Sequence, residues 1–182
     1  MLLRDIYKKI RFCIETDRIG PDIPFTHWML HFKSSMRKLC QKKFMKFGEN
    51  SEFRAGAYAV WCSHISIGKN VIIRPNTVLM PDEFAQIDIE DNVMIGMGVH
   101  IYVNNHKFDN IKVPIIEQGY YPSEGVRIKE GAWIGANSII LPGVTIGKNS
   151  VIGAGSIVTR SIPDAVVAAG NPAKIIKQIQ PT

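Results

Sequence analysis

The sequence predicts a mainly β fold, a parallel β-helix in which short strands wind around the three sides of a narrow prism. Aliphatic residues recur at every sixth position through the C-terminal half, and the chain contains 27 Ile but only 6 Leu. β-Branched residues favour strands over helices. A period of six fits three short strands per turn of the coil, whereas the 3.6-residue helical repeat would rotate successive members off a common face.

Residues 1–50 are expected to form a basic segment of helical or irregular structure ahead of the repeat. Residues 1–48 hold 11 Lys or Arg against 4 Asp or Glu, so this segment accounts for the net charge of +6. Apolar residues at helical spacing over residues 3–14 predict a short amphipathic helix, and residues 26–47 a second helical or irregular stretch. This segment either covers the first turn of the coil or contacts an anionic membrane surface.

Residues 51–165 are expected to form the coil itself. One row of aliphatics spaced by six residues consists of Ile128, Ile134, Ile140, Ile146, Ile152 and Val158. Shorter rows with the same period are Ile67, Ile73 and Leu79, then Ile89, Ile95 and Ile101. These rows are predicted to point into the prism, where stacked aliphatics stabilise the coil. Glycines that follow row members, at Gly135, Gly147 and Gly153, are expected at turns with unusual backbone angles.

Two further segments depart from the repeat. Residues 107–125 break the six-residue phase, which predicts a loop ejected from the coil. Residues 166–182 are expected to form a C-terminal tail with a short helix that caps the open end of the coil. Asn171 is a suitable N-cap for this helix, and Pro172 suits its first position.

Composition and patterning argue against several classes of protein. The first twelve residues carry charges every few positions, so no cleaved leader is expected. The longest uncharged stretch, 131–147, is interrupted by glycine and proline and does not suit a membrane-spanning helix. Three cysteines without metal-site spacing favour a reducing, cytoplasmic compartment. No motif for nucleic-acid binding is present.

Three blocks of the sequence resemble the hexapeptide-repeat acyltransferases, in the branch of the galactoside, maltose and surface-polysaccharide O-acetyltransferases. They are ISIGKNVIIRPNT, IDIEDNVMIGMGVHIYVNNH and GAWIGANSIILPGVTIGKNSVIGAGSIVTRSIPDAVVAAGNPAKIIK, which together cover most of residues 60–177. The resemblance implies a left-handed β-helix and a homotrimer with active sites between subunits. It implies acetyl-CoA as the acyl donor, a sugar or glycan as the acceptor, and a role in surface-polysaccharide biosynthesis; no metal is expected.

The same resemblance places the catalytic base on His106, at the start of the ejected loop. A sugar hydroxyl is a weak nucleophile at neutral pH, and an imidazole that removes its proton contributes typically 10²- to 10⁴-fold to the rate. Histidine has an unperturbed pKa suited to this task. Transfer is expected to be direct, without an acyl-enzyme intermediate.

Matching the family motifs also implies contacts to coenzyme A and to the acceptor. The expected coenzyme A contacts are Trp133, Ala136, Ala154, Thr159, Arg160, Lys174 and Lys177. Arg160 and Lys174 suit the phosphates of the adenosine end. The expected acceptor contacts are Asp82, Arg74 and Asn105. Arg74 stands where several relatives carry Asn, and this departure indicates an anionic or nucleotide-linked acceptor.

Three other functions are consistent with parts of the sequence. N-acetylation of an amino-sugar nucleotide would use the same donor and the same base. A non-catalytic β-helical scaffold would explain the repeat, but not His106 and the cofactor-like C-terminal block. His100 and His106 suggest a zinc site of the kind found in gamma-class carbonic anhydrases, but no third histidine is evident to complete it. In a coil, His64 and His100 would lie at outward or corner positions.

Overall fold

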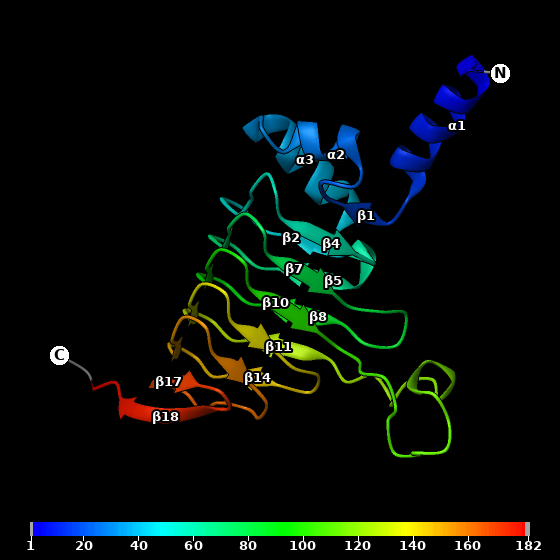
Figure 1. Cartoon of the computed structure of the whole chain (residues 1–182). Coiled ribbons are helices and arrows are strands. Elements are labelled where there is room, and N and C mark those ends of the chain that lie inside the picture. The colour runs from blue at the N-terminus through cyan, green and yellow to red at the C-terminus, as the bar shows by residue number, and fades with distance from the viewer. Residues whose placement is uncertain (1, 181–182) are drawn as a thin grey trace.

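The chain winds into a three-sided parallel β-helix with helices at its N-terminal end, as seen in a computed structural model that describes residues 2–180 (Figure 1). Consecutive strands visit three faces in turn, named here faces B, C and A. The strand pairs between β2 and β17 are parallel and join strands one turn apart on the same face, whereas β1 pairs antiparallel with β4 and β18 antiparallel with β17. This arrangement confirms the predicted three-sided coil.

The strands of the three faces are short. Face A contains β1 (Arg18–Ile19), β4 (Tyr58–Val60), β7 (Val78–Met80), β10 (His100–Tyr102), β13 (Ile139–Ile140) and β16 (Ile157–Val158). Face B contains β2 (Lys46–Phe47), β5 (Ile65–Ile67), β8 (Ile87–Ile89), β11 (Val126–Ile128) and β14 (Thr145–Ile146). Face C contains β3 (Glu52–Phe53), β6 (Ile72–Ile73), β9 (Met94–Ile95), β12 (Trp133–Ile134), β15 (Val151–Ile152), β17 (Val166–Gly170) and β18 (Ala173–Gln178).

The core of the β-helix is the stack of aliphatics that the sequence predicted. All members of the three rows are buried, from Ile67 to Val158. Where the coil continues, the companion positions four residues after a row member, such as Thr77 and Ser138, are buried as well. Buried hydroxyls require partners, and Ser138 donates to the carbonyl of Gly135 at 2.9 Å while Thr77 donates to that of Gly96 at 3.0 Å. The rows therefore form one continuous core.

The predicted reason for the glycines after row aliphatics is wrong. The positive φ angles lie two residues later, at Asn137, Asn149 and Gly155. Gly135 and Gly147 are instead needed because neighbouring turns approach closely: a Cβ on Gly135 would lie 2.5 Å from the backbone nitrogen of Ala154. The lack of space between turns, rather than the backbone angle, excludes a side chain at these two glycines.

Three helices form the N-terminal end of the molecule. They are α1 (Leu2–Glu15), α2 (Pro24–Met29) and α3 (Lys33–Lys43). α3 buries Met36, Leu39 and Cys40 in the same core as Phe47 and Phe53 of the first turn, so it covers the end of the β-helix. α1 packs against α2 and projects away from the body (Figure 1). None of the helices described over residues 2–180 is both long and apolar enough to cross a membrane.

The coil extends beyond the bounds of 51 and 165 predicted from sequence. β2 already pairs with β5, and β17 pairs in parallel with β15. The predicted C-terminal helix is wrong: Ala173–Gln178 form β18, which pairs antiparallel with β17. Residues 181 and 182, included in the predicted tail, lie outside the described residues. Two short 3₁₀ turns complete the chain, η1 (Cys62–His64) and η2 (Ile115–Glu117), the latter within the ejected loop.

Candidate active site

The ejected loop leaves the β-helix between β10 and β11, as predicted, and stands clear of the body (Figure 1). Its two arms form a short antiparallel stem. Three backbone hydrogen bonds of 2.8–3.0 Å join the arms: Lys107 N to Gly119 O, Tyr121 N to Asn105 O, and Glu124 N to Val103 O. The stem fixes the start of the loop, where the predicted base lies.

His106 lies on the outgoing arm of this stem, opposite Tyr120 on the returning arm. The two ring centroids are 4.2 Å apart and the ring planes are inclined by 31°. Both side chains are exposed. The Tyr120 ring therefore limits the orientations of the imidazole while leaving it accessible to a second molecule. Of the other loop aromatics, Phe108 and Tyr121 pack edge to face against each other.

The carboxylate of Asp82, predicted to contact the acceptor, is occupied by the protein itself. Oδ1 accepts hydrogen bonds from the backbone amides of Phe84 and Ala85, both at 2.9 Å. Oδ2 accepts from Asn104 Nδ2 at 2.7 Å and from the Ser123 hydroxyl. Partial burial of Asp82 opposes ionisation, but these hydrogen bonds outweigh it and hold the pKa of the carboxyl below its ordinary value.

One group of predicted coenzyme A contacts gathers at the corner between faces C and A. Ala136 and Ala154 occupy equivalent places in neighbouring turns, because Gly135 lies against Ala154. Lys174 lies opposite Ala169 on the adjoining strand pair. On face C, Trp133 is 49% exposed.

Trp133 and Arg74 line the same small cavity of about 180 Å³ on face C, together with Ile72, Met94, Ile95 and Gly96. Arg74 has no ion pair among residues 2–180, whereas Arg54, one turn earlier on the same face, pairs with Glu52 at 2.9 Å. The cavity thus combines an indole surface with an uncompensated guanidinium group.

The remaining predicted residues lie elsewhere in the chain. Thr159 and Arg160 follow β16 and therefore lie at the opposite edge of face A, the edge from which the ejected loop with His106 and Asn105 departs. Lys177 lies toward the far end of β18, opposite Val167. One copy of the chain consequently does not bring His106 together with Ala136 and Ala154.

Comparisons with known proteins identify the family. A profile described as "Bacterial transferase hexapeptide (six repeats)" matches residues 125–160. The galactoside O-acetyltransferase of Escherichia coli K12 is 39% identical over 141 residues, which are 78% of this chain and 67% of that protein. The chain belongs to the hexapeptide-repeat acetyltransferases. The three-sided coil is accordingly the left-handed β-helix of this family, as predicted.

Solved structures agree with this assignment. A galactoside acetyltransferase in complex with coenzyme A has a TM-score of 0.75 and 34% identity, with 85% of this chain and 77% of that chain covered. A hexapeptide-repeat acetyltransferase from Vibrio cholerae, complexed with acetyl coenzyme A, has a TM-score of 0.76 and 26% identity, with coverage of 88% and 91%. These complexes agree with acetyl-CoA as the expected donor, and the chain is an acyltransferase.

The cysteines of this acetyltransferase are unsuited to nucleophilic catalysis. Cys13, Cys40 and Cys62 are free thiols and all three are buried. Burial raises the pKa of the Cys40 and Cys62 thiols well above the ordinary value, and the thiolate is the reactive form. Among residues 2–180, no three His, Cys, Asp or Glu side chains form a group that could hold a metal ion.

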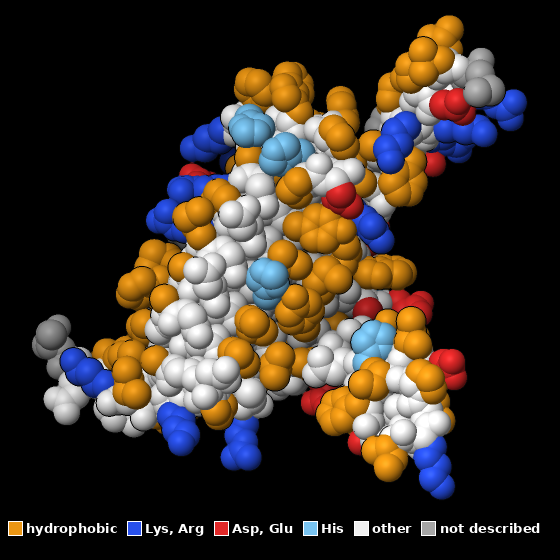
Figure 2. All heavy atoms as spheres, viewed as in Figure 1, with side chains coloured by type: hydrophobic (Ala, Val, Ile, Leu, Met, Phe, Trp, Pro, Cys, Tyr) orange, Lys and Arg blue, Asp and Glu red, His pale blue; other side chains and the backbone are white. Residues whose placement is uncertain are grey.

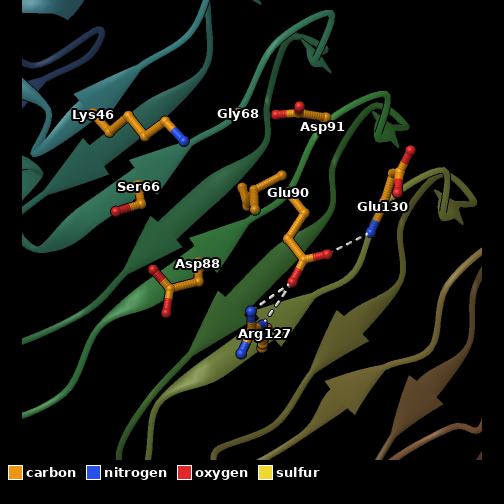
Figure 3. A pocket seen from close by; sticks show the side chains of 9 residues that line it. Lys46, Ser66, Gly68, Asp88, Glu90, Asp91, Arg127 and Glu130 are labelled. Atoms are coloured by element: carbon orange, nitrogen blue, oxygen red, sulfur yellow. Dashed lines mark hydrogen bonds and ion pairs between the residues drawn. The ribbon is translucent and has the colours of Figure 1, made fainter.

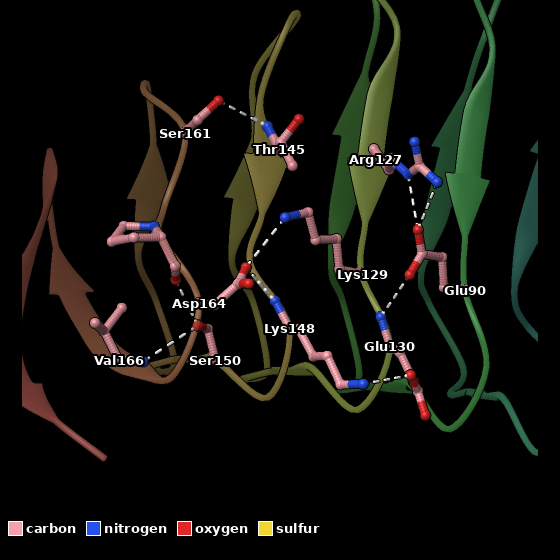
Figure 4. Close-up of polar contacts among 11 residues, drawn as sticks. Glu90, Arg127, Lys129, Glu130, Thr145, Lys148, Ser150, Ser161, Asp164 and Val166 are labelled. Atoms are coloured by element: carbon pink, nitrogen blue, oxygen red, sulfur yellow. Dashed lines mark hydrogen bonds and ion pairs between the residues drawn. The ribbon is translucent and has the colours of Figure 1, made fainter. Parts of the chain in front are cut away.

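A separate polar cavity of about 460 Å³ lies on face B (Figure 3). Lys46, Ser66, Asp88 and Arg127 line it from successive turns, and Arg127 is paired with Glu90 at 2.7 Å. Further polar contacts continue this network toward the C-terminal turns (Figure 4), where Lys148 pairs with Glu130, and Lys129 with Asp164. These contacts tie neighbouring turns of the face together. None of the predicted site residues lines this cavity.

Asn104 and Ser123 are the residues of the site region that sequence reasoning missed. They lie at the two ends of the ejected loop, and both donate to Asp82. No motif or spacing marks them, because their partner lies 22 residues before Asn104 and 41 residues before Ser123. Only the position of Asn104, two residues before His106, could have drawn attention to it.

Proposed function

We propose that this acetyltransferase transfers the acetyl group of acetyl-CoA to a hydroxyl of a sugar, with His106 as general base, in the biosynthesis of a surface polysaccharide. The observation that carries the proposal is the placement of His106: its imidazole is held on a hydrogen-bonded stem, against Tyr120, and is open to a bound acceptor. The galactoside O-acetyltransferase relatives support a sugar acceptor.

The proposed reaction is a direct transfer. The acceptor oxygen attacks the thioester carbonyl carbon while the neutral imidazole of His106 takes the hydroxyl proton. A C–O bond forms, the tetrahedral intermediate collapses with cleavage of the C–S bond, and the imidazolium returns the proton to the departing thiolate of coenzyme A. Buried cysteines with raised pKa values agree with a route that forms no acyl-enzyme.

The proposed assembly is a homotrimer in which each active site is shared between subunits. His106 lies at one edge of face A, and Ala136 and Ala154 lie at the other. In a ring with cyclic symmetry, each copy presents one edge to the next copy and the other edge to the previous one. A neighbour can therefore supply the base that the coenzyme A groove of one copy lacks.

Arg74 supports an acceptor with a negative charge near the thioester. At the corner between faces C and A, the predicted coenzyme A contacts run along the coil from Ala136 through Ala154 to Lys174, and Lys174, which suits the adenosine phosphates, lies at the C-terminal end. The thioester end would then point toward Trp133 and the unpaired Arg74. A guanidinium group binds carboxylates and phosphates well. The same cavity therefore favours, as a second candidate, N-acetylation of an amino-sugar nucleotide.

We place the enzyme in the cytoplasm, with peripheral contact to an anionic membrane through α1. The three free cysteines suit a reducing compartment. α1 exposes apolar side chains, among them Leu2 at 73% and Leu3 at 83%, and its sequence interleaves them with Arg4, Lys8, Lys9 and Arg11. Hydrophobic and basic side chains accordingly share the surface of this helix (Figure 2). Such a helix binds at the interface of anionic bilayers. The expected cover of the first turn is provided by α3, which leaves α1 free for this contact.

The test is acetyl transfer from acetyl-CoA to a panel of neutral, uronic and nucleotide-linked sugars, with wild type beside His106→Ala. The variant is expected to lose at least about 100-fold in kcat, as removal of a general base does, while coenzyme A binding measured by calorimetry is retained. His31→Ala, on the surface of the N-terminal end, is the matched control. Unchanged turnover in His106→Ala would refute the base assignment, and absence of transfer by wild type would favour a scaffold.

A further inference from the structure

Asp82 links both arms of the loop stem to the β-helix. Its Oδ2 accepts hydrogen bonds from Asn104, which lies two residues before His106, and from Ser123, which lies three residues after Tyr120. The arms that carry the His106 and Tyr120 rings are therefore both tied to this carboxylate.

The second carboxylate oxygen anchors Asp82 itself. Oδ1 accepts hydrogen bonds from the amides of Phe84 and Ala85, in the turn that follows β7. A carboxylate has about four lone-pair positions, and these four donors use them all. A sugar hydroxyl could bind Asp82 only by displacing Asn104 or Ser123, which would release the stem that carries the base.

We propose that Asp82 is a positioning residue, which clamps the two arms of the stem and thereby holds His106 and Tyr120 in the orientation needed for catalysis. The proposal rests on the proposed function of His106, and it differs from the acceptor contact that the resemblance implied for Asp82. The lowered pKa of the carboxyl keeps it ionised at neutral pH, which suits an acceptor of four hydrogen bonds.

Asp82→Asn is the discriminating substitution. The amide keeps the shape of the carboxylate but replaces one acceptor oxygen with a donor nitrogen, which then faces either two backbone N–H groups or the Asn104 and Ser123 donors. Asp88→Asn is the matched control, because Asp88 lies on the next strand, β8, outside the stem. If Asp82→Asn fails to fold, a second pair of variants tests the clamp. Ser123→Ala removes one donor to Asp82, and Ser123→Thr keeps it.

Two measurements separate positioning from acceptor binding. Steady-state kinetics on Asp82→Asn should show kcat lowered about 10- to 100-fold with the acceptor KM within about twofold of wild type. In the His106→Ala variant, the same substitution should lower kcat by no more than about a further twofold, because the effects of substituting residues that act as a unit are not additive. The proposal would be overturned if Asp82→Asn raised the acceptor KM and lowered kcat by the same factor in the wild type and in the His106→Ala variant.

Hydrogen exchange gives a readout that does not depend on activity. The amides of Lys107, Tyr121 and Glu124, which close the stem, should exchange faster in Asp82→Asn and Ser123→Ala, and at wild-type rates in Asp88→Asn and Ser123→Thr. Unchanged exchange in Asp82→Asn would rule out the clamp. Faster exchange in a protein whose wild type transfers acetyl to no sugar would instead refute the proposed function while supporting the clamp.

Discussion

At the scale of single residues, two features allow the chain to turn tightly between the faces: residues with a positive φ angle, and glycines where neighbouring turns of the coil touch. In most connections between faces, one residue adopts a left-handed conformation. The majority of these residues are Asn or Gly, among them Asn50, Asn70, Asn76, Asn92, Gly98, Gly131, Asn137, Gly143, Asn149 and Gly155. These two residue types tolerate positive φ best. A second set, including Gly147, has no positive φ and exists to let one turn touch the next.

The two features predict opposite outcomes for glycine substitutions. A Cβ on Gly147 would lie 2.3 Å from the backbone carbonyl carbon of Pro163, so Gly147→Ala should destabilise the fold by roughly 1–3 kcal/mol, as overpacking does. Gly155 has φ +70 and open space around its Cβ position. Gly155→Asn should therefore change the free energy of unfolding by less than about 0.5 kcal/mol. Chemical denaturation of both variants measures the difference in the free energy of unfolding; equal losses would contradict the distinction between spacing at Gly147 and backbone angle at Gly155.

At the scale of elements, the aliphatic rows were predictable because inward positions in a coil repeat with a fixed period. Ile134, Ile140 and Ile146 occupy equivalent places on faces C, A and B, so one sequence pattern reports three strands. The ejected loop was predictable for the same reason, as a break in the period. The stem clamp was not, since Asp82 meets Asn104 and Ser123 only after the coil has formed.

The C-terminal element shows how an edge strand can override local helix signals. Asn171 and Pro172 suit the start of a helix, yet Ala173–Gln178 pair with β17. β17 is the last parallel strand of face C, and without β18 it would leave a row of unpaired backbone groups at the end of the coil. Pairing that edge supplies backbone hydrogen bonds that a capping helix would not, and propensity is a weak preference beside it.

At the same scale, we predict that α1 binds to anionic membranes. Its exposed Leu2, Leu3, Ile6 and Ile10 would insert at the headgroup boundary while the basic residues contact anionic lipid. The protein should float with vesicles that contain 30% phosphatidylserine at low salt, and less at high salt. Leu3→Glu together with Ile6→Glu should abolish flotation, whereas Ile111→Glu together with Ile116→Glu, on the exposed ejected loop, should not. Flotation that persists in the double variant, or that is equal on neutral vesicles, would contradict the assignment.

At the scale of the whole molecule, the three faces differ in the side chains they present outward. Face B presents Lys46, Ser66, Asp88, Arg127 and Thr145. The outward side chains of face A are mostly apolar, such as Val78, Met80, Ile139 and Ile157 beside His100, and those of face C are Ile72, Met94, Trp133 and Val151 beside Glu52. Apolar outward surface of this extent is characteristic of interfaces. In the proposed homotrimer, faces A and C would contact other copies, and face B would face water.

If the active site is shared between subunits, a mixture of two inactive variants should recover activity. An active site contained in one chain would not allow this recovery. His106→Ala removes the proposed base but keeps the groove, whereas Ala154→Tyr fills the groove with a large side chain but keeps the base. Each variant alone should be inactive.

When the two are unfolded together and refolded as a mixture, about one quarter of the sites should pair an intact His106 with an intact groove, because the contact between neighbours in a cyclic trimer is heterologous. Acetyl transfer should therefore recover to about that fraction of wild type, and recovery should be absent when the variants are refolded separately and then combined under conditions that prevent exchange. No recovery in the refolded mixture would place base and groove in the same chain, against the separation of His106 from Ala136 and Ala154 across face A.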